Sequence, residues 1–296
     1  MVNNRKIVYI AGYGRSGSTI LNILLLQPEG VVGVGELVNI FQSGWTVNRN
    51  CSCGEKTSDC PFWSRVKTAW EKDANYSIQE YAAVQKKYRR IFAMPYLFWL
   101  NIFPDERFKK FKHDTALLYE SIFKISECRV IVDSSKDVSW LYLMKKMGLN
   151  PSVIHLVRDG RSVLRSMRKQ WRKGIKPKSA FSIAFSWISN NALVEIFKKN
   201  TKNIFIKYED LISAPEQVLD KIDDAFDIGL DDVKTAIATG KPLSKKHLIS
   251  GNPIRLEKDL IFQQDKGLKN NITLSKRELL IFKITGYFWL KKYKYI

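Results

Sequence analysis

The stretch Ile7–Gln27, IVYIAGYGRSGSTILNILLLQ, predicts a buried strand, a glycine-rich turn and a helix in direct succession. The strand covers residues 7–10, and the helix begins at Ser18 and ends before Pro28. Glycines let the backbone of such a turn approach an anion, while the first N–H groups of the helix point at it. The helix dipole adds roughly half a positive charge at that end. The sequence therefore predicts a phosphate-binding loop between the strand and the helix.

The residues of this loop differ from those of nucleotide hydrolases. Their loop reads G-x-x-x-x-G-K-[ST], and its lysine reaches the terminal phosphates beside a magnesium ion. Here Gly12 and Gly17 have the same separation, but Ser18 takes the place of the lysine and Arg15 is the fixed cation. For the turn alone, an ordinary strand–turn–helix unit without a ligand is an alternative. The residues expected around an anion are Gly14, Arg15, Ser16, Gly17, Ser18 and Thr19.

Composition limits the class of protein. A chain of 296 residues with 45% hydrophobic content suits one globular α/β domain with insertions, and its net charge of +20 attracts anions. Arginine-rich tails and zinc-finger spacings are absent from the sequence, which disfavours a nucleic-acid function. No signal-peptide pattern is present, and the aromatic stretch 94–103 is too short to span a bilayer. We expect a cytoplasmic protein whose exposed aromatic residues allow peripheral contact with a membrane.

Two further strands end in candidate functional residues. Val31–Gly35 is followed by Glu36, and Arg129–Asp133 is followed shortly by Lys136. The alternation of strands and helices along the chain predicts a mainly parallel sheet flanked by helices, an α/β fold. In such sheets ligands bind at the carboxyl ends of the strands. A lysine there can stabilise negative charge that develops on a leaving oxygen.

The segment HLVRDGRSVLRS, residues 155–166, predicts a second anion site. A strand ending at Val157 delivers Arg158, and the following helix delivers Ser166 two turns later. A guanidinium and a hydroxyl placed in this way can hold a phosphate monoester. An arginine–aspartate ion pair at the strand end is the structural alternative.

Three cysteines lie within ten residues, in CSCGEKTSDC. The spacing of Cys51, Cys53 and Cys60 lacks a second Cys-x2-Cys pair or a clear fourth ligand, and this disfavours zinc. Either a local disulfide such as Cys51–Cys60 or a set of reduced structural thiols is favoured.

Four segments, R-S-G-S-T, V-G-E-L, D-S-S-K and V-R-D-G-R, resemble in this order the sulfotransferases that use 3′-phosphoadenosine 5′-phosphosulfate (PAPS). The resemblance is to the bacterial type, with similarity to protein-tyrosine sulfotransferases in the loop, the glutamate and V-R-D-G-R. It extends from Ile7 to about Arg255. It implies that the first loop binds the 5′-phosphosulfate without a metal. It also implies that Glu36 is the catalytic base and that Lys136 and Arg15 stabilise the reacting group.

The same resemblance implies the rest of the donor site. Arg158 and Ser166 match the residues that bind the 3′-phosphate. Tyr208, the last residue of a strand predicted over Ile204–Tyr208, matches a tyrosine near the adenine. A C-terminal segment closes over the adenosine 3′-phosphate through Gly251, Asn252 and Arg255. The implied reaction is the in-line transfer of a sulfuryl group to an acceptor hydroxyl, with a saccharide or glycolipid as the favoured acceptor.

We expect one sulfotransferase domain over residues 1–296. Within it, residues 61–127 form a helical cap that shapes the acceptor pocket, and residues 245–296 form a cofactor lid and an amphipathic packing helix over 274–295. Two other functions remain open from the residues. One is a P-loop kinase, which would need the missing lysine and magnesium, and the other is a noncatalytic module that binds polyanions.

Overall fold

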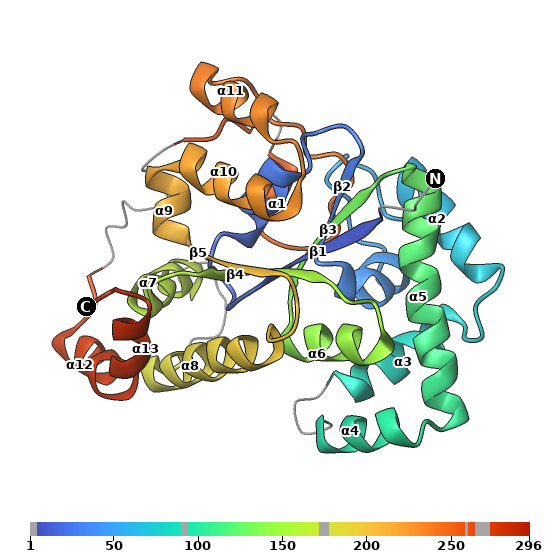
Figure 1. Cartoon of the computed structure of the whole chain (residues 1–296), viewed down its shortest axis with the longest axis horizontal. Helices are drawn as coiled ribbons and strands as arrows, with labels where there is room; N and C mark the ends of the chain where they lie inside the picture. Colours follow the sequence, from blue (N-terminus) through green and yellow to red (C-terminus); the bar gives the residue numbers. More distant parts are fainter. Residues whose placement is uncertain (1–4, 90–93, 172–177, 258–259, 264–272) are drawn as a thin grey trace.

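A parallel β-sheet lies at the centre of the molecule (Figure 1). The computed structural model describes residues 5–89, 94–171, 178–257, 260–263 and 273–296. Within these ranges five strands pair in the order β2-β3-β1-β4-β5, and each pair of neighbours is parallel. The strands are β1 (Lys6–Ala11), β2 (Val31–Gly35), β3 (Val130–Lys136), β4 (Ser152–Val157) and β5 (Asn203–Lys207). The predicted α/β fold with a mainly parallel sheet is confirmed.

Helices connect the strands and cover both faces of the sheet. The first part of the chain contains α1 (Ser18–Leu25), a 3₁₀ turn (Leu37–Asn39), a π-helical turn (Ile40–Thr46), α2 (Pro61–Glu71), α3 (Ile78–Tyr88), α4 (Met94–Ile102) and α5 (Glu106–Ser126). The later part contains α6 (Val138–Met147), α7 (Gly160–Trp171), α8 (Ala180–Phe197), α9 (Tyr208–Ser213), α10 (Pro215–Phe226), α11 (Asp231–Thr239), a 3₁₀ turn (Pro253–Leu256), α12 (Lys276–Thr285) and α13 (Tyr287–Lys292). Within the described ranges, no helix combines the length and the apolar character that crossing a membrane requires.

Strand β1 shows how the two faces are filled. Val8 and Ile10 belong to the core formed with α1, α10 and α11, whereas Ile7 and Tyr9 belong to the core formed with α2, α3, α5 and α6. Successive side chains of a strand point to opposite faces, and here both faces are buried. The apolar run of this strand is therefore continuous. In Figure 1, α1 and α9–α11 lie on one side of the sheet, with α5, α6 and α8 on the other.

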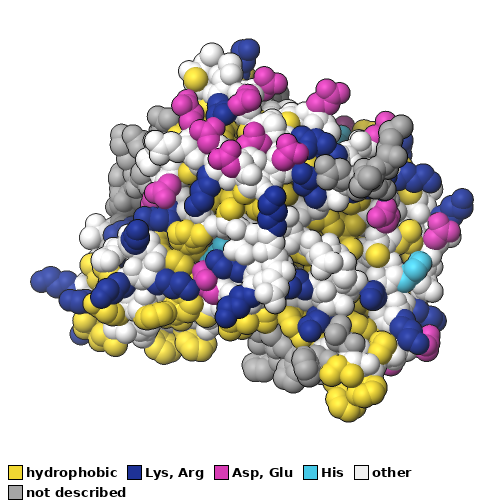
Figure 2. Space-filling model, viewed as in Figure 1, with side chains coloured by type: hydrophobic (Ala, Val, Ile, Leu, Met, Phe, Trp, Pro, Cys, Tyr) yellow, Lys and Arg dark blue, Asp and Glu magenta, His cyan; other side chains and the backbone are white. Residues whose placement is uncertain are grey.

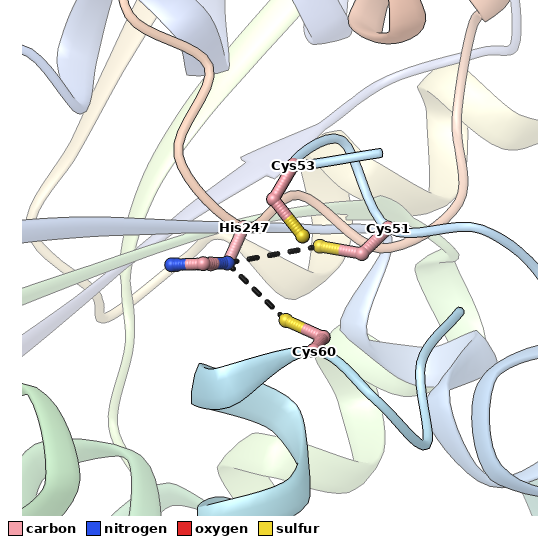
Figure 3. Close-up of side chains that lie close together, drawn as sticks. All are labelled: Cys51, Cys53, Cys60 and His247. Atoms are coloured by element: carbon pink, nitrogen blue, oxygen red, sulfur yellow. Dashed lines mark hydrogen bonds between the residues drawn. The ribbon is translucent and has the colours of Figure 1, made fainter. Parts of the chain in front are cut away.

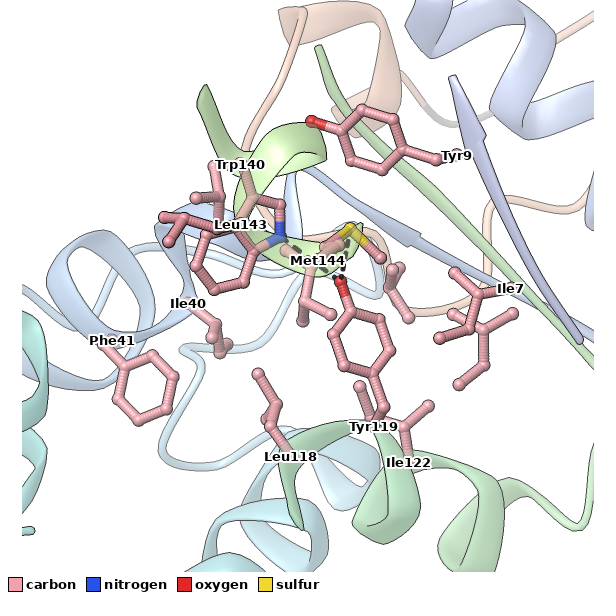
Figure 4. Close-up of a cluster of buried hydrophobic side chains, with 14 of the residues drawn as sticks. Ile7, Tyr9, Ile40, Phe41, Leu118, Tyr119, Ile122, Trp140, Leu143 and Met144 are labelled. Atoms are coloured by element: carbon pink, nitrogen blue, oxygen red, sulfur yellow. Dashed lines mark hydrogen bonds between the residues drawn. The ribbon is translucent and has the colours of Figure 1, made fainter. Parts of the chain in front are cut away.

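The larger core contains polar side chains that find partners inside it (Figure 4). The Tyr119 hydroxyl donates to Oδ2 of Asp133 over 2.8 Å and accepts from Nε1 of Trp140 over 3.3 Å. All three side chains are fully or almost fully buried. Buried polar groups must be hydrogen-bonded to avoid a desolvation penalty, so this trio fixes α5 and α6 against the middle of β3.

Three boundaries differ from the sequence prediction. The single C-terminal helix predicted over 274–295 is wrong, because Gly286 leaves helical geometry (φ −103°, ψ 2°) and separates α12 from α13. Glycine is a poor helix former, which accounts for the break. Tyr208 begins α9 instead of ending β5, and β3 extends to Lys136. Part of the predicted lid, residues 258–259 and 264–272, lies outside the described residues.

One buried carboxylate ties the turn after α2 to α5. Asp114 accepts hydrogen bonds from the backbone N–H groups of Asn75 and Tyr76, both at 2.9 Å, and from Nδ2 of Asn75 at 2.8 Å. We expect Asp114→Ala to lower the free energy of unfolding by about 1–3 kcal/mol, because buried N–H donors would lose their acceptor. Urea denaturation measures this change.

A matched control lies on the same helix. Glu120 is exposed and pairs with Arg5 at 2.9 Å, and exposed ion pairs contribute roughly 0–1 kcal/mol. Glu120→Ala should therefore change stability far less than Asp114→Ala. Equal losses for the two variants would show that Asp114 does not hold the turn.

Candidate functional site

The loop between β1 and α1 is built from unusual backbone conformations. Gly12 has φ +151°, and a Cβ atom at this position would lie 2.2 Å from the carbonyl oxygen of Leu156. Gly17, at the N-cap of α1, has φ +89°, and Arg15 has φ +73°. Glycine reaches such values without steric cost, whereas a non-glycine residue is held there by its surroundings. The predicted strand–turn–helix is confirmed.

A pocket of about 390 Å³ opens at the carboxyl edge of the sheet, next to this loop. It is lined by residues at or just after the carboxyl ends of all five strands, by two residues of α7 and by the segment after α11. They are Gly14, Arg15, Gly17, Ser18, Thr19, Ile20, Glu36, Lys136, Arg158, Ser166, Lys169, Tyr208, Gly251, Asn252, Pro253 and Ile254. The structure therefore brings together all the residues predicted for the site except Ser16 and Arg255.

The two predicted anion sites face the same pocket and touch one another. Nε of Arg15 donates to Oγ of Ser166 over 3.1 Å, and Nη1 of Arg158 donates to the carbonyl oxygen of Arg15 over 3.2 Å. The Arg158 guanidinium lies over the Tyr208 ring, 4.2 Å from its centroid. The Tyr208 ring in turn packs on Gly17, where a Cβ atom would lie 2.3 Å from the ring. Glycine at position 17 thus permits the close contact between loop and tyrosine.

The pocket is strongly positive. Arg15, Lys136, Arg158 and Lys169 line it, and Glu36 is the one carboxylate among its described lining residues. Burial lowers the pKa of Arg15, and the like charge of Arg158 acts in the same direction. A bound anion would relieve the repulsion between these cations.

Lys169 was missed by the sequence analysis. It lies three residues after Ser166 on α7, and residues three apart share a helix face. Lys169 could therefore have been predicted from its spacing to Ser166.

Glu36 and Lys136 form an ion pair across the ends of β2 and β3. The second carboxylate oxygen of Glu36 accepts from Nδ2 of Asn39 at 3.0 Å and from Oγ of Ser250 at 3.3 Å. Lys136 has φ +62°, a conformation that costs a non-glycine residue about 1–3 kcal/mol and occurs often at functional sites. The pair is therefore held in place from both sides.

The segment 247–256 forms one wall of the pocket. Ile249 pairs with Gly35, the last residue of β2, and its carbonyl oxygen accepts the N–H of Glu36 over 2.8 Å. Gly251 has φ +106°, and the N–H of Asn252 donates to Oγ1 of Thr19 over 3.2 Å. The C-terminal segment is thus attached to both Glu36 and the first turn of α1.

Two predicted residues lie outside the lining. Ser16 is buried, and its Oγ has no hydrogen-bond partner within the described residues. Arg255 is also buried, and its Nη1 donates to the carbonyl oxygen of Leu248 over 3.2 Å. Arg255 therefore supports the backbone of the pocket wall from behind.

A second cavity of about 550 Å³ adjoins the pocket and shares Ile20, Tyr208 and Ile254 with it. Its remaining lining is largely apolar. The remaining residues are Ile212, Leu243, Glu257, Leu260, Ile261, Phe262 and Gln263. A charged pocket thus continues into an apolar one.

The three clustered cysteines lie around His247 (Figure 3). Cys51, Cys53 and Cys60 are free thiols, so of the two alternatives given by the sequence the structure has the reduced one. The contact between Cys51 and Cys60 lowers the pKa of Cys60 and raises that of Cys51. His247 was not expected beside them, because it follows Cys60 by 187 residues.

The fold is an α/β fold with a mainly parallel sheet, and a cationic pocket opens at the carboxyl edge of this sheet. The model of the sulfotransferase family matches residues 8–232, well over half of the chain. The chain belongs to the sulfotransferase family and is a sulfotransferase enzyme. No curated protein sequence matches it significantly. The particular similarity to protein-tyrosine sulfotransferases stays a prediction.

Solved structures support the fold. The sulfotransferase domain of the Synechococcus PCC 7002 olefin synthase matches with a TM-score of 0.54 at 16% identity, covering 96% of this chain and 94% of that domain. The sulfotransferase domain from the curacin biosynthetic pathway gives 0.48 at 16% identity, with 95% and 98% coverage. Sulfotransferase STF9 from Mycobacterium avium gives 0.47 at 12% identity, with 79% and 68% coverage. The first of these matches supports the α/β fold.

A buried carboxylate supports the pocket from below. Asp133, in the middle of β3, accepts from the N–H of Ser135 over 2.8 Å, and Oγ of Ser135 accepts the N–H of Val38 over 3.0 Å. Burial raises the pKa of Asp133 to about 6, against the opposing effect of its hydrogen bonds. The native state therefore binds the proton of the Asp133 carboxyl group more tightly than the unfolded state does, since the pKa of an aspartate in an unfolded chain is about 3.9.

Stability should therefore fall as pH rises between these two values. Because of Asp133, we expect the free energy of unfolding of the wild type to fall by roughly 2–3 kcal/mol between pH 4 and pH 7. Asp133→Asn should not show this fall. Urea denaturation of both proteins across this range measures the difference. Asp232→Asn, at an exposed position of α11, is the control and should follow the wild type. Parallel curves for Asp133→Asn would refute the assignment.

Proposed function

We propose that this enzyme transfers a sulfuryl group from PAPS to an acceptor hydroxyl. The observation that carries the proposal is the meeting of two anion sites in one pocket. The start of α1 with Arg15 supplies one, and Arg158 with Ser166 supplies the other. PAPS is an adenosine with phosphate groups at two positions, so two adjoining cationic sites suit it. A ligand with a single phosphate would leave one of them unused.

The residues present fit such a donor in both charge and shape. A Cβ atom on Gly14 would meet nothing within 4 Å, so the loop backbone is open to a ligand at this position. Arg158 and Ser166 suit the 3′-phosphate, and the N–H groups at the start of α1 suit the 5′-phosphosulfate. The apolar second cavity, which begins at Tyr208 and Ile254, suits the adenine. Arg255 and Ser16 would act indirectly in this arrangement, by holding the loops.

The donor supplies the sulfuryl group, and the chain supplies charge and a base. Glu36 takes the proton of the acceptor hydroxyl while the acceptor oxygen forms its bond to sulfur. The bond from sulfur to the bridging oxygen breaks in line with this attack. Arg15, Lys136 and the helix-start N–H groups balance the negative charge on the sulfate oxygens and the departing nucleotide, a type of contact that contributes about 2.7–4 kcal/mol.

The geometry around Glu36 suits this role. Lys136 has three N–H donors, so it can hold one oxygen of Glu36 and still reach a sulfate oxygen. Asn39 and Ser250 hold the other carboxylate oxygen. The base is thereby oriented before the acceptor arrives, which lowers the entropic cost of reaction.

We further propose that the chain is one sulfotransferase domain with two specialised parts. Residues 61–127 would form the acceptor side, and residues 245–296 the donor lid with its packing helices. Arg89 on α3 supports the first assignment, because it pairs with Asp137 at 2.7 Å and approaches the carbonyl oxygen of Val38 at 3.5 Å. Both partners lie next to the candidate catalytic residues. The contact of Asn252 with Thr19 supports the second assignment.

A saccharide or glycolipid is the acceptor class that we propose. Trp99 and Phe103, at the end of α4, are each 59% exposed, with ring centroids 4.8 Å apart. Exposed aromatic rings suit sugar rings and the interface of a membrane. Figure 2 shows hydrophobic side chains over α4 and over α12, at opposite ends of the face in view, and many lysines and arginines on the same face. Such a surface allows peripheral contact with anionic lipid.

Glu36→Gln should abolish transfer while leaving donor binding intact. Glutamine keeps the size and an acceptor oxygen for Lys136 but cannot take a proton, so we expect turnover to fall by about 10²–10⁴-fold. Transfer from radiolabelled PAPS to a panel of saccharides and glycolipids gives the rate. Glu29→Gln, at an exposed position after α1, is the control. Unchanged turnover in Glu36→Gln would remove this residue from the mechanism.

Arg158→Ala should weaken adenosine 3′,5′-bisphosphate selectively. Losing a charge-assisted contact costs about 1.5–3 kcal/mol, or roughly 10–150-fold in affinity. Calorimetry should show this loss for the bisphosphate and little change for adenosine 5′-monophosphate, which lacks the 3′-phosphate. Arg65→Ala, at an exposed position of α2, is the control. Equal losses for both nucleotides would refute the 3′-phosphate assignment.

The same calorimetry separates the alternative functions. A kinase would prefer ATP with magnesium over the bisphosphate. A noncatalytic module would bind unrelated polyanions equally well, with an affinity that falls steeply with salt. Preference of the wild type for adenosine 3′,5′-bisphosphate is the result that we expect.

A further inference from the structure

Four potential metal ligands converge beside the pocket wall, outside the pocket itself (Figure 3). They are the sulfur atoms of Cys51, Cys53 and Cys60 and a ring nitrogen of His247, and all lie within 4.8 Å of one another. Nδ1 of His247 is 3.2 Å from the sulfur of Cys60 and 3.9 Å from that of Cys51. In Figure 3 the four side chains point toward a common centre.

These separations suit a tetrahedral ion. Zinc bonds to sulfur at about 2.3 Å and to nitrogen at about 2.0–2.1 Å, which places neighbouring ligand atoms about 3.6–3.8 Å apart. The two measured sulfur–nitrogen distances lie on either side of this value. Small movements of side chains would therefore complete the geometry.

The local structure holds each ligand in place. The turn that carries Cys51 and Cys53 closes through a hydrogen bond from Gly54 to the carbonyl oxygen of Cys51 at 3.1 Å, and Gly54 has φ +103°. Cys60 is the N-cap of α2, and Pro61 fixes the first turn of that helix.

The histidine is oriented as well. The Phe62 ring stacks on His247 at a centroid distance of 5.3 Å, and Nε1 of Trp63 donates to the backbone carbonyl of His247 over 2.7 Å. Contacts of this kind fix the orientation of metal ligands. Residues that follow the cysteines thus hold a ligand from the far end of the chain.

We propose that Cys51, Cys53, Cys60 and His247 bind a structural Zn²⁺ ion. Three thiolates and one imidazole form a closed four-ligand set, which is typical of structural zinc and leaves no open position for a substrate. Sulfur ligands also select against magnesium and calcium. The reaction itself needs no part of this ion.

The ion would connect the segment before α2 to the pocket wall. His247 is followed by Ile249, which pairs with Gly35, and by Ser250, which donates to Glu36. Two residues later Asn252 contacts Thr19 at the phosphate loop. Zinc at His247 thereby fixes the start of the segment that orients the candidate base.

A disulfide is the competing state of these thiols. A bond between Cys51 and Cys60 would use two of the four groups and leave Cys53 and His247 without a function in the cluster. Convergence of all four groups favours the metal. Oxidation is therefore an outcome that the experiment must detect.

The metal content of the full-length protein tests the proposal. Protein purified under reducing conditions with zinc in the medium should contain about one Zn²⁺ per chain by inductively coupled plasma mass spectrometry. Cys60→Ser and His247→Ala should each lower this to below roughly a tenth of the wild-type content under the same conditions. Cys128→Ser is the matched control, because Cys128 is a buried free thiol outside the cluster, and it should keep the metal.

Cobalt gives a second readout that does not depend on the variants folding normally. Wild-type protein loaded with Co²⁺ should show thiolate-to-cobalt charge transfer and the intense visible bands of a tetrahedral site. The proposal is overturned by wild-type protein without zinc and without these bands, by variants that keep the metal, or by a Cys51–Cys60 disulfide found by peptide mass spectrometry in the reduced preparation. Binding of adenosine 3′,5′-bisphosphate, measured separately, keeps the donor assignment distinct from this result.

Discussion

Repulsion between like charges in one pocket is the constraint on which this structure depends. Arg15 and Arg158 both line this pocket, and burial together with the charge of Arg158 lowers the pKa of Arg15. The chain holds both guanidiniums with neutral acceptors, namely Oγ of Ser166, the carbonyl of Arg15 and the face of Tyr208. These contacts position the two cations through neutral groups. A multiply charged anion bound in the pocket would relieve the repulsion between the cations.

The sheet makes this arrangement possible. Residues far apart in the sequence meet because each follows the carboxyl end of a parallel strand, as Glu36 follows β2 and Lys136 ends β3. Both faces of the sheet are covered, so its buried edge is rigid enough to support residues such as Lys136 in an unfavourable backbone conformation. The enzyme thus places charged residues and a left-handed lysine at one edge of the sheet, and the cores on its two faces provide the stability that offsets their cost.

Much of this could be predicted from the sequence, because strand ends and glycine-rich turns are local signals. The strand–turn–helix at Gly17, the strand before Glu36 and the R-D-G-R segment after β4 each needed only a few neighbouring residues to recognise. Parallel topology then placed them on one edge. The boundary at Tyr208 could not be predicted as well, since helix starts depend on tertiary packing as well as propensity. The break at Gly286 did have a local signal, the low helix propensity of glycine, which the sequence prediction did not use. Arg255 was assigned by resemblance alone, and its position behind the pocket wall depends on the path of the whole loop.

Local sequence patterns could not reveal contacts between residues that are far apart in the sequence. His247 reaches the cysteines over 187 residues, and no spacing within the cluster indicates a partner so distant. The pairing of Ile249 with Gly35 likewise joins distant parts of the sequence, and this affects when the pocket can form during synthesis. The hydrogen bond from Ser250 to Glu36 spans 214 residues, so a nascent chain that has exposed its loop, its glutamate and its lysine still lacks the wall beside them. Because domains form as the ribosome extends the chain, this enzyme acquires its complete binding surface only after Ile254, the last lining residue of the pocket, has been translated.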